Sequence, residues 1–96
     1  MTIKQLVKQT KGRVYVYLAN DYIGRQFLKD AEREGFTFRD GVKPTEREPD
    51  SIFALNRDMT INYVGFVGHM AYGCAKKIGD ERLFRVDYGE ILMREK

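Results

Sequence analysis

The chain has 96 residues, 43% of them hydrophobic and 32% charged, which fits one small globular domain and argues against a disordered chain. No apolar run approaches about 20 residues, so we expect no transmembrane helix, and we predict no membrane partner. The single cysteine cannot form an internal disulfide framework, which favours a reducing, cytoplasmic location.

The net charge of +3 is distributed unevenly along the chain. Residues 1–33 hold seven Lys or Arg and three acids, giving +4, whereas the remaining residues hold ten bases and eleven acids, giving −1. We therefore expect any electrostatic attraction to an anion to come from the first third of the chain.

The first two elements are expected to be a short helix and a strand. Residues 2–10 have apolar side chains at helical spacing, and we predict that Gly12 ends this helix. Residues 13–19 follow as a strand with two apolar faces, one of which carries Val14 and Val16. A strand of this kind suits the interior of a sheet.

The main helix is expected to span residues 21–34. Asn20 or Asp21 can cap its first turn, and its apolar side chains recur every four residues as a buried stripe. Gly24 costs ~1 kcal/mol relative to Ala inside a helix, and we expect it to allow close approach to the sheet. Gly35 is expected to provide the left-handed C-cap.

The second half of the chain is dominated by β-prone runs. Residues 36–38 should form a strand parallel to the first one, adjacent to it or one strand apart. Residues 42–50 contain two prolines and five charges, so we expect a long loop without a regular element. Residues 51–56 and 61–67 read as a hairpin, and residues 83–88 as a last strand before a tail or helical turn.

The order of these elements predicts the fold class. Residues 13–38 give a strand, a helix and a strand with almost no linker, and the rest of the chain is expected to pack around them. We predict a single α+β domain over residues 1–96, with a mixed four- or five-stranded sheet. This sheet would have a β-α-β start, a C-terminal hairpin and one main helix packed on one face.

Three cations of the main helix, Arg25, Lys29 and Arg33, stand four residues apart and therefore share one face. Like charges at this spacing destabilise a helix slightly, so helix stability does not explain them. We predict that this face, joined by Lys4 and Lys8 of the first helix, contacts nucleic acid or an acidic protein. The alternative interpretation is a solvated face whose charge is neutralised by neighbouring acids.

A glycine-rich run at residues 65–73 combines close backbone approach with rings that can stack on a flat ligand. It lacks the spacing of a dinucleotide-binding motif or a P-loop. The alternative is a bulged strand end and a turn with its rings in the core. The candidate ligand-binding residues of this run are Gly65, Phe66, Gly68, His69 and Tyr72.

Catalytic and metal-binding patterns are weak. Pro49-Asp50 begins like the PD-(D/E)xK nuclease motif, but residues 52–56 supply neither the second acid nor the lysine. The one histidine, His69, and the one cysteine, Cys74, cannot build a Cys/His metal site within one chain. We therefore predict a non-enzymatic binding module with no metal and no cofactor.

Three runs carry a resemblance to a known group of proteins: GFTFRDGVKP at residues 35–44, DSIFAL at residues 50–55 and TINYVGFVG at residues 60–68. Together they resemble small uncharacterised proteins of prophages and conjugative elements of Gram-positive bacteria. The likeness extends from residue 14 to residue 73 and includes no catalytic motif. The resemblance implies a mobile-element origin and a cytoplasmic accessory or host-modulating role.

An alternative function is a protein–protein adaptor or a homodimeric structural protein with no nucleic-acid role. The contact surface would then be an exposed sheet edge, the face carrying Tyr15 and Tyr17, or the loop at residues 46–50.

Overall fold

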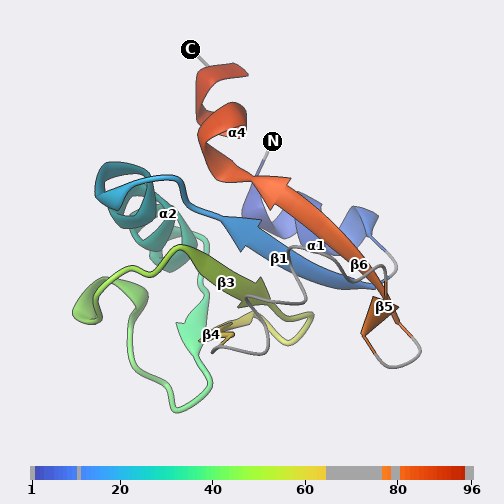
Figure 1. Ribbon diagram of the computed structural model, residues 1–96. Coiled ribbons are helices and arrows are strands. Elements are labelled where there is room, and N and C mark those ends of the chain that lie inside the picture. Colours follow the sequence, from blue (N-terminus) through green and yellow to red (C-terminus); the bar gives the residue numbers. More distant parts are fainter. Residues whose placement is uncertain (1, 11, 65–76, 79–80, 95–96) are drawn as a thin grey trace.

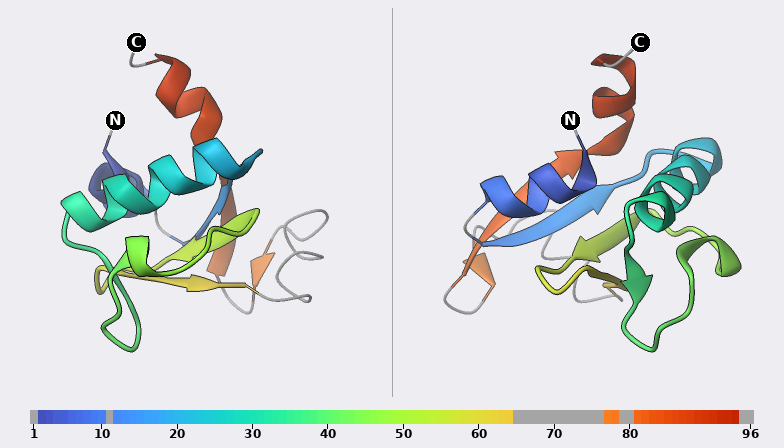
Figure 2. Two further views of the ribbon diagram at one scale, coloured as in Figure 1. Left: turned by 90° about the vertical axis from the view of Figure 1, so that its left-hand side faces the viewer. Right: turned by 180° about the vertical axis from the view of Figure 1, so that it is seen from behind.

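The structure is a computed structural model that describes residues 2–10, 12–64, 77–78 and 81–94. Within these residues a mixed sheet is covered on one face by two helices, and a third helix extends from one end of the sheet, as Figures 1 and 2 show. Five strands form the main sheet and a two-residue strand, β5, extends it at one edge. The predicted α+β class, with its mixed sheet, is confirmed.

The strand order is β2-β4-β3-β1-β6-β5. β1 pairs antiparallel with β3 and parallel with β6, β3 pairs antiparallel with β4, and β2 pairs parallel with β4. As predicted, β3 and β4 form a hairpin, and β1 lies in the interior of the sheet. The strand bounds are β1 Arg13–Tyr17, β2 Thr37–Phe38, β3 Ile52–Leu55, β4 Thr60–Tyr63, β5 Lys77–Ile78 and β6 Glu81–Asp87.

The position of β2 differs from the expectation. β2 runs parallel to β1, as predicted, but two strands lie between them instead of one or none. The long connection from β2 to β3 passes the position of β4, so the β3–β4 hairpin lies between β2 and β1 and β2 is at the edge of the sheet. In the sheet β2 pairs with β4, and Phe38 also donates its N–H to the Val42 carbonyl and accepts the Gly41 N–H, both at 2.9 Å.

Helix α1, Ile3–Gln9, begins with a capping box in which Thr2 and Gln5 satisfy each other's backbone N–H groups. It ends at Thr10, whose backbone is extended, and not at Gly12 as predicted. The Thr10 hydroxyl donates a hydrogen bond to the Leu6 carbonyl at 2.8 Å and so satisfies one of the free carbonyls of the last turn.

Helix α2, Asp21–Arg33, is capped by Asn20, whose side-chain oxygen accepts the Ile23 N–H at 2.9 Å. Gly35 follows the helix at φ +95°, in the predicted left-handed conformation. Gly24 was expected to allow close approach of the helix to the sheet, but its close neighbour is the long loop. A Cβ at this position would lie 2.7 Å from the Cβ of Pro49.

Helix α4, Tyr88–Arg94, follows β6 and projects from one end of the sheet (Figure 1). The predicted tail or helical turn is therefore a helix of seven residues. Tyr88 and Ile91 are buried against the core. Gly89 lies so close to α2 that a Cβ at this position would be 2.9 Å from Cδ1 of Ile23. No helix in the described parts of the chain is long and apolar enough to cross a membrane.

The core lies between the helices and the sheet. Phe27 of α2 is at its centre, stacked on Phe53 of β3 at 5.7 Å and edge-on to Tyr88 at 5.2 Å between ring centroids. The alternation predicted for β1 is correct, because Val14 and Val16 face the helices. A smaller buried cluster on the opposite face contains Tyr15, Ile52, Ala54 and Leu83.

The long loop is fixed against α2. It contains a short 3₁₀ helix, η1, at Pro44–Glu46, whereas no regular element was expected. Glu32 accepts the N–H of Thr45 at 3.1 Å and its O–H at 2.7 Å, and these bonds lower the pKa of Glu32. Arg47 is ion-paired with Asp40, which holds the pKa of that carboxyl below its usual value.

Candidate functional site

Arg25 lies on the exposed side of α2, as predicted, but it has two acidic partners. Its Nε is 2.7 Å from Oδ2 of Asp21, one turn earlier in the helix, and a terminal nitrogen is 2.8 Å from Oε2 of Glu48 in the long loop. The hydrogen bonds to Asp21 and Glu48 raise the pKa of the Arg25 guanidinium above its ordinary value. Its positive charge is therefore largely compensated within the chain.

The other two cations of the helix face differ from each other. Arg33 is 2.7 Å from Oδ1 of Asp30, a buried carboxylate. Lys29 has no ion pair among the described residues. It lines a hollow of about 80 Å³ together with Arg25 and Arg47, each of which has its own carboxylate partner. The alternative interpretation, in which neighbouring acids neutralise the helix face, is therefore correct for Arg25 and Arg33 but, within the described residues, not for Lys29.

The lysines of α1 do not extend this face. Lys4 is exposed, and its backbone N–H donates to Glu34 at 2.9 Å. Lys8 is exposed in the last turn of α1 and lines a hollow of about 350 Å³ with Arg57 of the β3–β4 turn. Within the described residues no contact joins the side chain of either lysine to the cations of α2.

Positive charge gathers instead at the end of the sheet where β1 begins. A second hollow, of about 200 Å³, is lined by Arg13, Arg39 and Arg57 together with residues of β3 and its turn. Arg57 lines both hollows, so the four side chains form one continuous region. We call Lys8, Arg13, Arg39 and Arg57 the sheet-end cluster.

Three members of the sheet-end cluster lack acidic partners among the described residues. All four cations are exposed, and within the described chain Lys8, Arg39 and Arg57 have no carboxylate at ion-pair distance. Arg57 makes one long hydrogen bond, 3.5 Å to the Thr10 carbonyl. Guanidinium groups without a carboxylate partner in the described parts of the chain, such as those of Arg39 and Arg57, attract anions such as phosphates and carboxylates.

Sequence reasoning missed Arg39 and Arg57 because each stands alone in a connecting segment with no periodic partner. Two features of the chain could have identified the sheet-end cluster in advance. The β3–β4 hairpin was predicted and places Arg57 at its turn, and the pairing of Val14 with Leu55 brings Arg13 next to that turn. The second feature requires the strand order, which single-sequence patterns did not provide.

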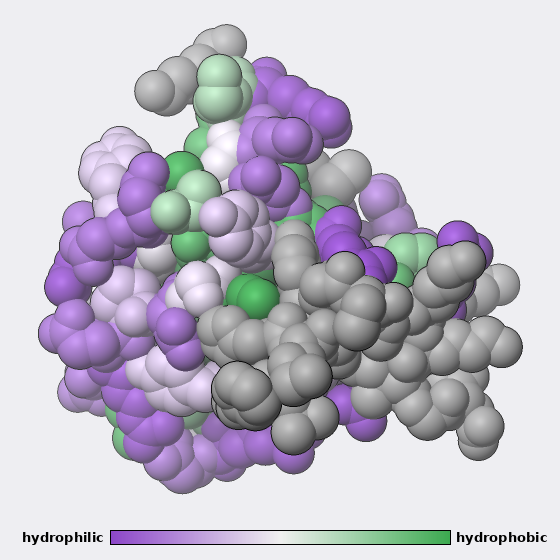
Figure 3. Space-filling view, viewed as in Figure 1, coloured by the Kyte–Doolittle hydropathy of each residue, from purple (hydrophilic) through white to green (hydrophobic). Residues whose placement is uncertain are grey.

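A larger hollow lies between α2 and α4, with a volume of about 600 Å³. Two large hydrophobic side chains on its rim are unusually open to solvent, Tyr22 at 70% and Met93 at 75% exposure. Figure 3 shows apolar surface between α4 at the top of the molecule and α2 at its left. We call this hollow the α2–α4 groove; its lining is Ala19, Asn20, Tyr22, Ile23, Gln26, Asp87, Gly89, Glu90, Leu92 and Met93.

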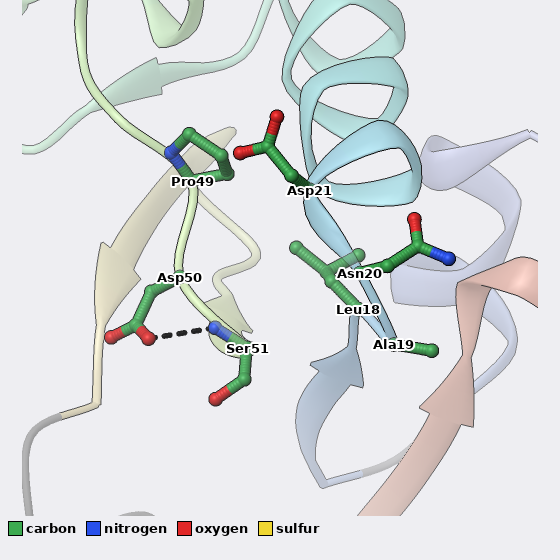
Figure 4. Close-up of a pocket in the computed structure, with 7 residues that line it drawn as sticks. All are labelled: Leu18, Ala19, Asn20, Asp21, Pro49, Asp50 and Ser51. Atoms are coloured by element: carbon green, nitrogen blue, oxygen red, sulfur yellow. Dashed lines mark hydrogen bonds between the residues drawn. The ribbon is translucent and has the colours of Figure 1, made fainter.

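A further hollow, of about 270 Å³, separates the start of α2 from the end of the long loop (Figure 4). Asp21 and Asp50 stand on opposite sides of it, and Asp50 accepts the Ser51 N–H at 2.7 Å. Two carboxylates beside the N-terminus of α2 disfavour an anion there, although helix N-termini otherwise attract anions.

The remaining predicted surfaces are less open, or they fall outside the described residues. Tyr15 is buried, with 7% exposure, and Tyr17 is half-buried, so their face of the sheet is not an open tyrosine surface. The glycine-rich candidates Gly65, Phe66, Gly68, His69 and Tyr72 lie outside the described residues, as does Cys74. Within the described residues, no three His, Cys, Asp or Glu side chains are grouped to hold a metal ion.

The chain was compared with known protein families, with curated proteins and with solved structures. None of the three comparisons finds a match.

Proposed function

We propose that this protein is a non-enzymatic binding module that holds the phosphate backbone of nucleic acid through the sheet-end cluster. One observation carries the proposal: Lys8, Arg39 and Arg57 come from three separate segments of the chain and line adjoining hollows without carboxylate partners in the described residues. Cations that stabilised the fold would be expected to pair with acids, as Arg25 and Arg33 do.

The chemistry of the cluster favours phosphates over bases. Guanidinium groups offer planar, forked donors that match phosphate oxygens, and Lys8 adds a compact charge. Among the described residues, no aromatic side chain lines either hollow, so these residues offer no platform for base stacking inside them. The proposed binding is therefore electrostatic, only weakly dependent on sequence, and sensitive to salt.

Fluorescence anisotropy with labelled duplex DNA and single-stranded RNA tests this proposal. Four phosphate contacts give a log–log salt slope of about −3 to −4, so affinity should fall by roughly 100-fold between 50 and 200 mM salt. Absence of binding to both probes at 50 mM salt would overturn the proposal.

Matched charge removals locate the site. Arg39→Gln and Arg57→Gln should each weaken binding by about tenfold and reduce the salt slope by about one. Lys29→Gln on α2 removes the same charge from an exposed position outside the cluster, and we expect less than about a threefold effect. Equal losses from all three variants would show that net charge, and not this cluster, governs binding.

The competing ligand is an acidic protein. Polyglutamate of matched charge should bind at least tenfold more weakly than DNA, because the phosphate backbone carries a dense, regular charge whose condensed counter-ions are released when the protein binds. Equal affinity for polyglutamate would move the proposal to an acidic polypeptide partner.

The proposed cellular role is that of a cytoplasmic accessory protein of a mobile genetic element. The single cysteine supports the compartment, and the resemblance over residues 14–73 supports the context. Expression of the tagged chain followed by fractionation with and without nuclease treatment is the corresponding test. Release from the nucleic-acid fraction by nuclease is the expected result.

A further inference from the structure

We infer that the α2–α4 groove is the contact between two copies of this chain, with α4 of each copy lying antiparallel to α4 of the other. Each copy provides both a protruding side chain, Met93, and a groove that can receive the Met93 of the other copy. Met93 protrudes at 75% exposure beside a hollow of about 600 Å³. In a two-fold arrangement the Met93 side chain of each copy enters the groove of the other, beside Tyr22 and Leu92.

The charges on α4 are self-complementary. Glu90 and Arg94 are both exposed and lie one turn apart, yet within the described chain neither has an ion-pair partner. Antiparallel pairing of two α4 helices places Glu90 of each copy opposite Arg94 of the other, with Met93 between them. A two-fold contact therefore forms two identical ion pairs around an apolar centre.

The acidic lining of the groove also favours a partner segment of positive charge. Among the described residues that line it, Asp87 and Glu90 are acidic and none is basic. An acidic or phosphate-bearing partner would be repelled there, whereas the basic last turn of α4, which carries Arg94, has the complementary sign.

Helix α4 gains stability from such a contact. Seven residues are too few for a helix to be stable without packing. Within one chain, only Tyr88 and Ile91 of α4 are buried, which leaves the side that carries Met93 uncovered. Gly89 and Ile23, which both line the groove, approach each other closely, and this contact holds α4 against α2 and keeps the groove preformed.

This contact is independent of the proposed nucleic-acid site. The sheet-end cluster lies where β1 begins, at Arg13, whereas Ala19 and Asn20 of the groove follow the end of the same strand. Failure of one proposal therefore leaves the other intact, and each set of variants can be assayed for both properties.

Sedimentation equilibrium of the full chain between about 1 μM and 1 mM, at 50 mM salt, tests the inference. We expect a monomer–dimer equilibrium that weakens with salt, and at least a tenfold increase in the dimer Kd for Met93→Asp. A wild-type chain that remains monomeric throughout the concentration range overturns the inference. If it stays monomeric but its groove NMR signals shift on addition of a Lys/Leu-rich helical peptide, the groove accepts a basic partner protein instead.

A charge-swap pair tests the antiparallel geometry. Glu90→Arg and Arg94→Glu should each weaken self-association by at least about tenfold, because each places like charges opposite one another. An equimolar mixture of the two variants should recover a dimer, since every pair in the mixed species is again opposite in sign. Dimerisation of either single variant at wild-type strength, or a mixture that stays monomeric, overturns the α4–α4 contact.

Lys29→Glu is the matched control. It reverses an exposed charge on α2 outside the groove lining and should leave self-association within about twofold of wild type. Circular dichroism of every variant verifies that the monomer is folded.

Discussion

Tyr88 donates its phenol O–H to the carboxylate of Asp30, and both residues are buried. Asp30 lies in the last half of α2 and Tyr88 is the first residue of α4, so this bond joins the two helices that form the groove. Gln26 and Arg33 donate to the other carboxylate oxygen at 3.0 and 2.7 Å. The carboxylate is thus fully partnered, which is what burial of a charged group requires.

Replacing Tyr88 with phenylalanine should destabilise the protein. Tyr88→Phe keeps the ring against Phe27 but leaves one oxygen of a buried carboxylate without its donor, which costs about 1–3 kcal/mol in free energy of unfolding. Urea unfolding measures the loss. Tyr22→Phe removes an exposed phenol and should change stability by less than about 0.5 kcal/mol, so equal effects of the two variants would contradict this role for the hydroxyl.

The same tyrosine predicts a loss of stability in alkali. Burial, together with the hydrogen bond to Asp30, raises the pKa of Tyr88 above its ordinary value. Because the folded state holds the proton more tightly, its contribution is fully present below about pH 10, where the unfolded tyrosine titrates, and declines as pH rises further. Between pH 9 and 11, the free energy of unfolding measured in urea should fall more steeply with pH for wild type than for Tyr88→Phe. Parallel pH dependences of the two proteins would contradict this role for Tyr88. Burial also raises the pKa of Tyr63, but Tyr63 is present in both proteins and cancels.

Gly24→Ala should destabilise the protein although alanine favours helices. A Cβ at this position would lie 2.7 Å from the Pro49 Cβ, and relief requires movement of the loop away from α2, at a cost of about 1–3 kcal/mol. Pro49→Gly removes the opposing atoms. In a double-mutant cycle measured by urea unfolding, Gly24→Ala should become neutral or stabilising in the Pro49→Gly background. Additive effects would exclude the clash.

Glu34→Ala should loosen α1 selectively. The Glu34 carboxylate accepts the N–H groups of Ile3 at 3.0 Å and Lys4 at 2.9 Å, which satisfies donors in the first turn of α1 from the end of α2. Its loss should cost about 1 kcal/mol and speed amide hydrogen exchange in α1. Glu32→Ala is the crossed control, because its carboxylate holds Thr45 instead, so faster exchange is expected in the long loop but not in α1.

Local patterns predicted the elements well because the residues that form them are neighbours in sequence. The Asn20 cap, the apolar stripe of α2, the Gly35 terminus and the alternating faces of β1 all follow from spacing within one segment. Strand order was harder to predict. The displacement of β2 depends on how the β3–β4 hairpin competes for the edge of β1, and that competition involves residues far apart in the chain.

The charged surface likewise includes features visible in local sequence and others that depend on contacts between distant residues. The row of Arg25, Lys29 and Arg33 was visible as a helical repeat, but the partner that compensates Arg25 from the loop, Glu48, is 23 residues away. Arg39 and Arg57 carry no repeat at all and meet only because the strands bring their ends together. Sequence reasoning therefore found the cations that are regularly spaced and missed Arg39 and Arg57, which belong to no repeat.

β1 joins the two proposed surfaces, since it begins at the sheet-end cluster and leads directly into the groove. Two chains joined at their grooves would carry their cationic ends outward, on opposite sides of the assembly. Once one end had attached to a long polyanion, the second would be tethered near further phosphates, and its effective concentration would rise. Such a protein would respond to the length of a polymer, gaining avidity on strands long enough to reach both ends and losing it on short ones.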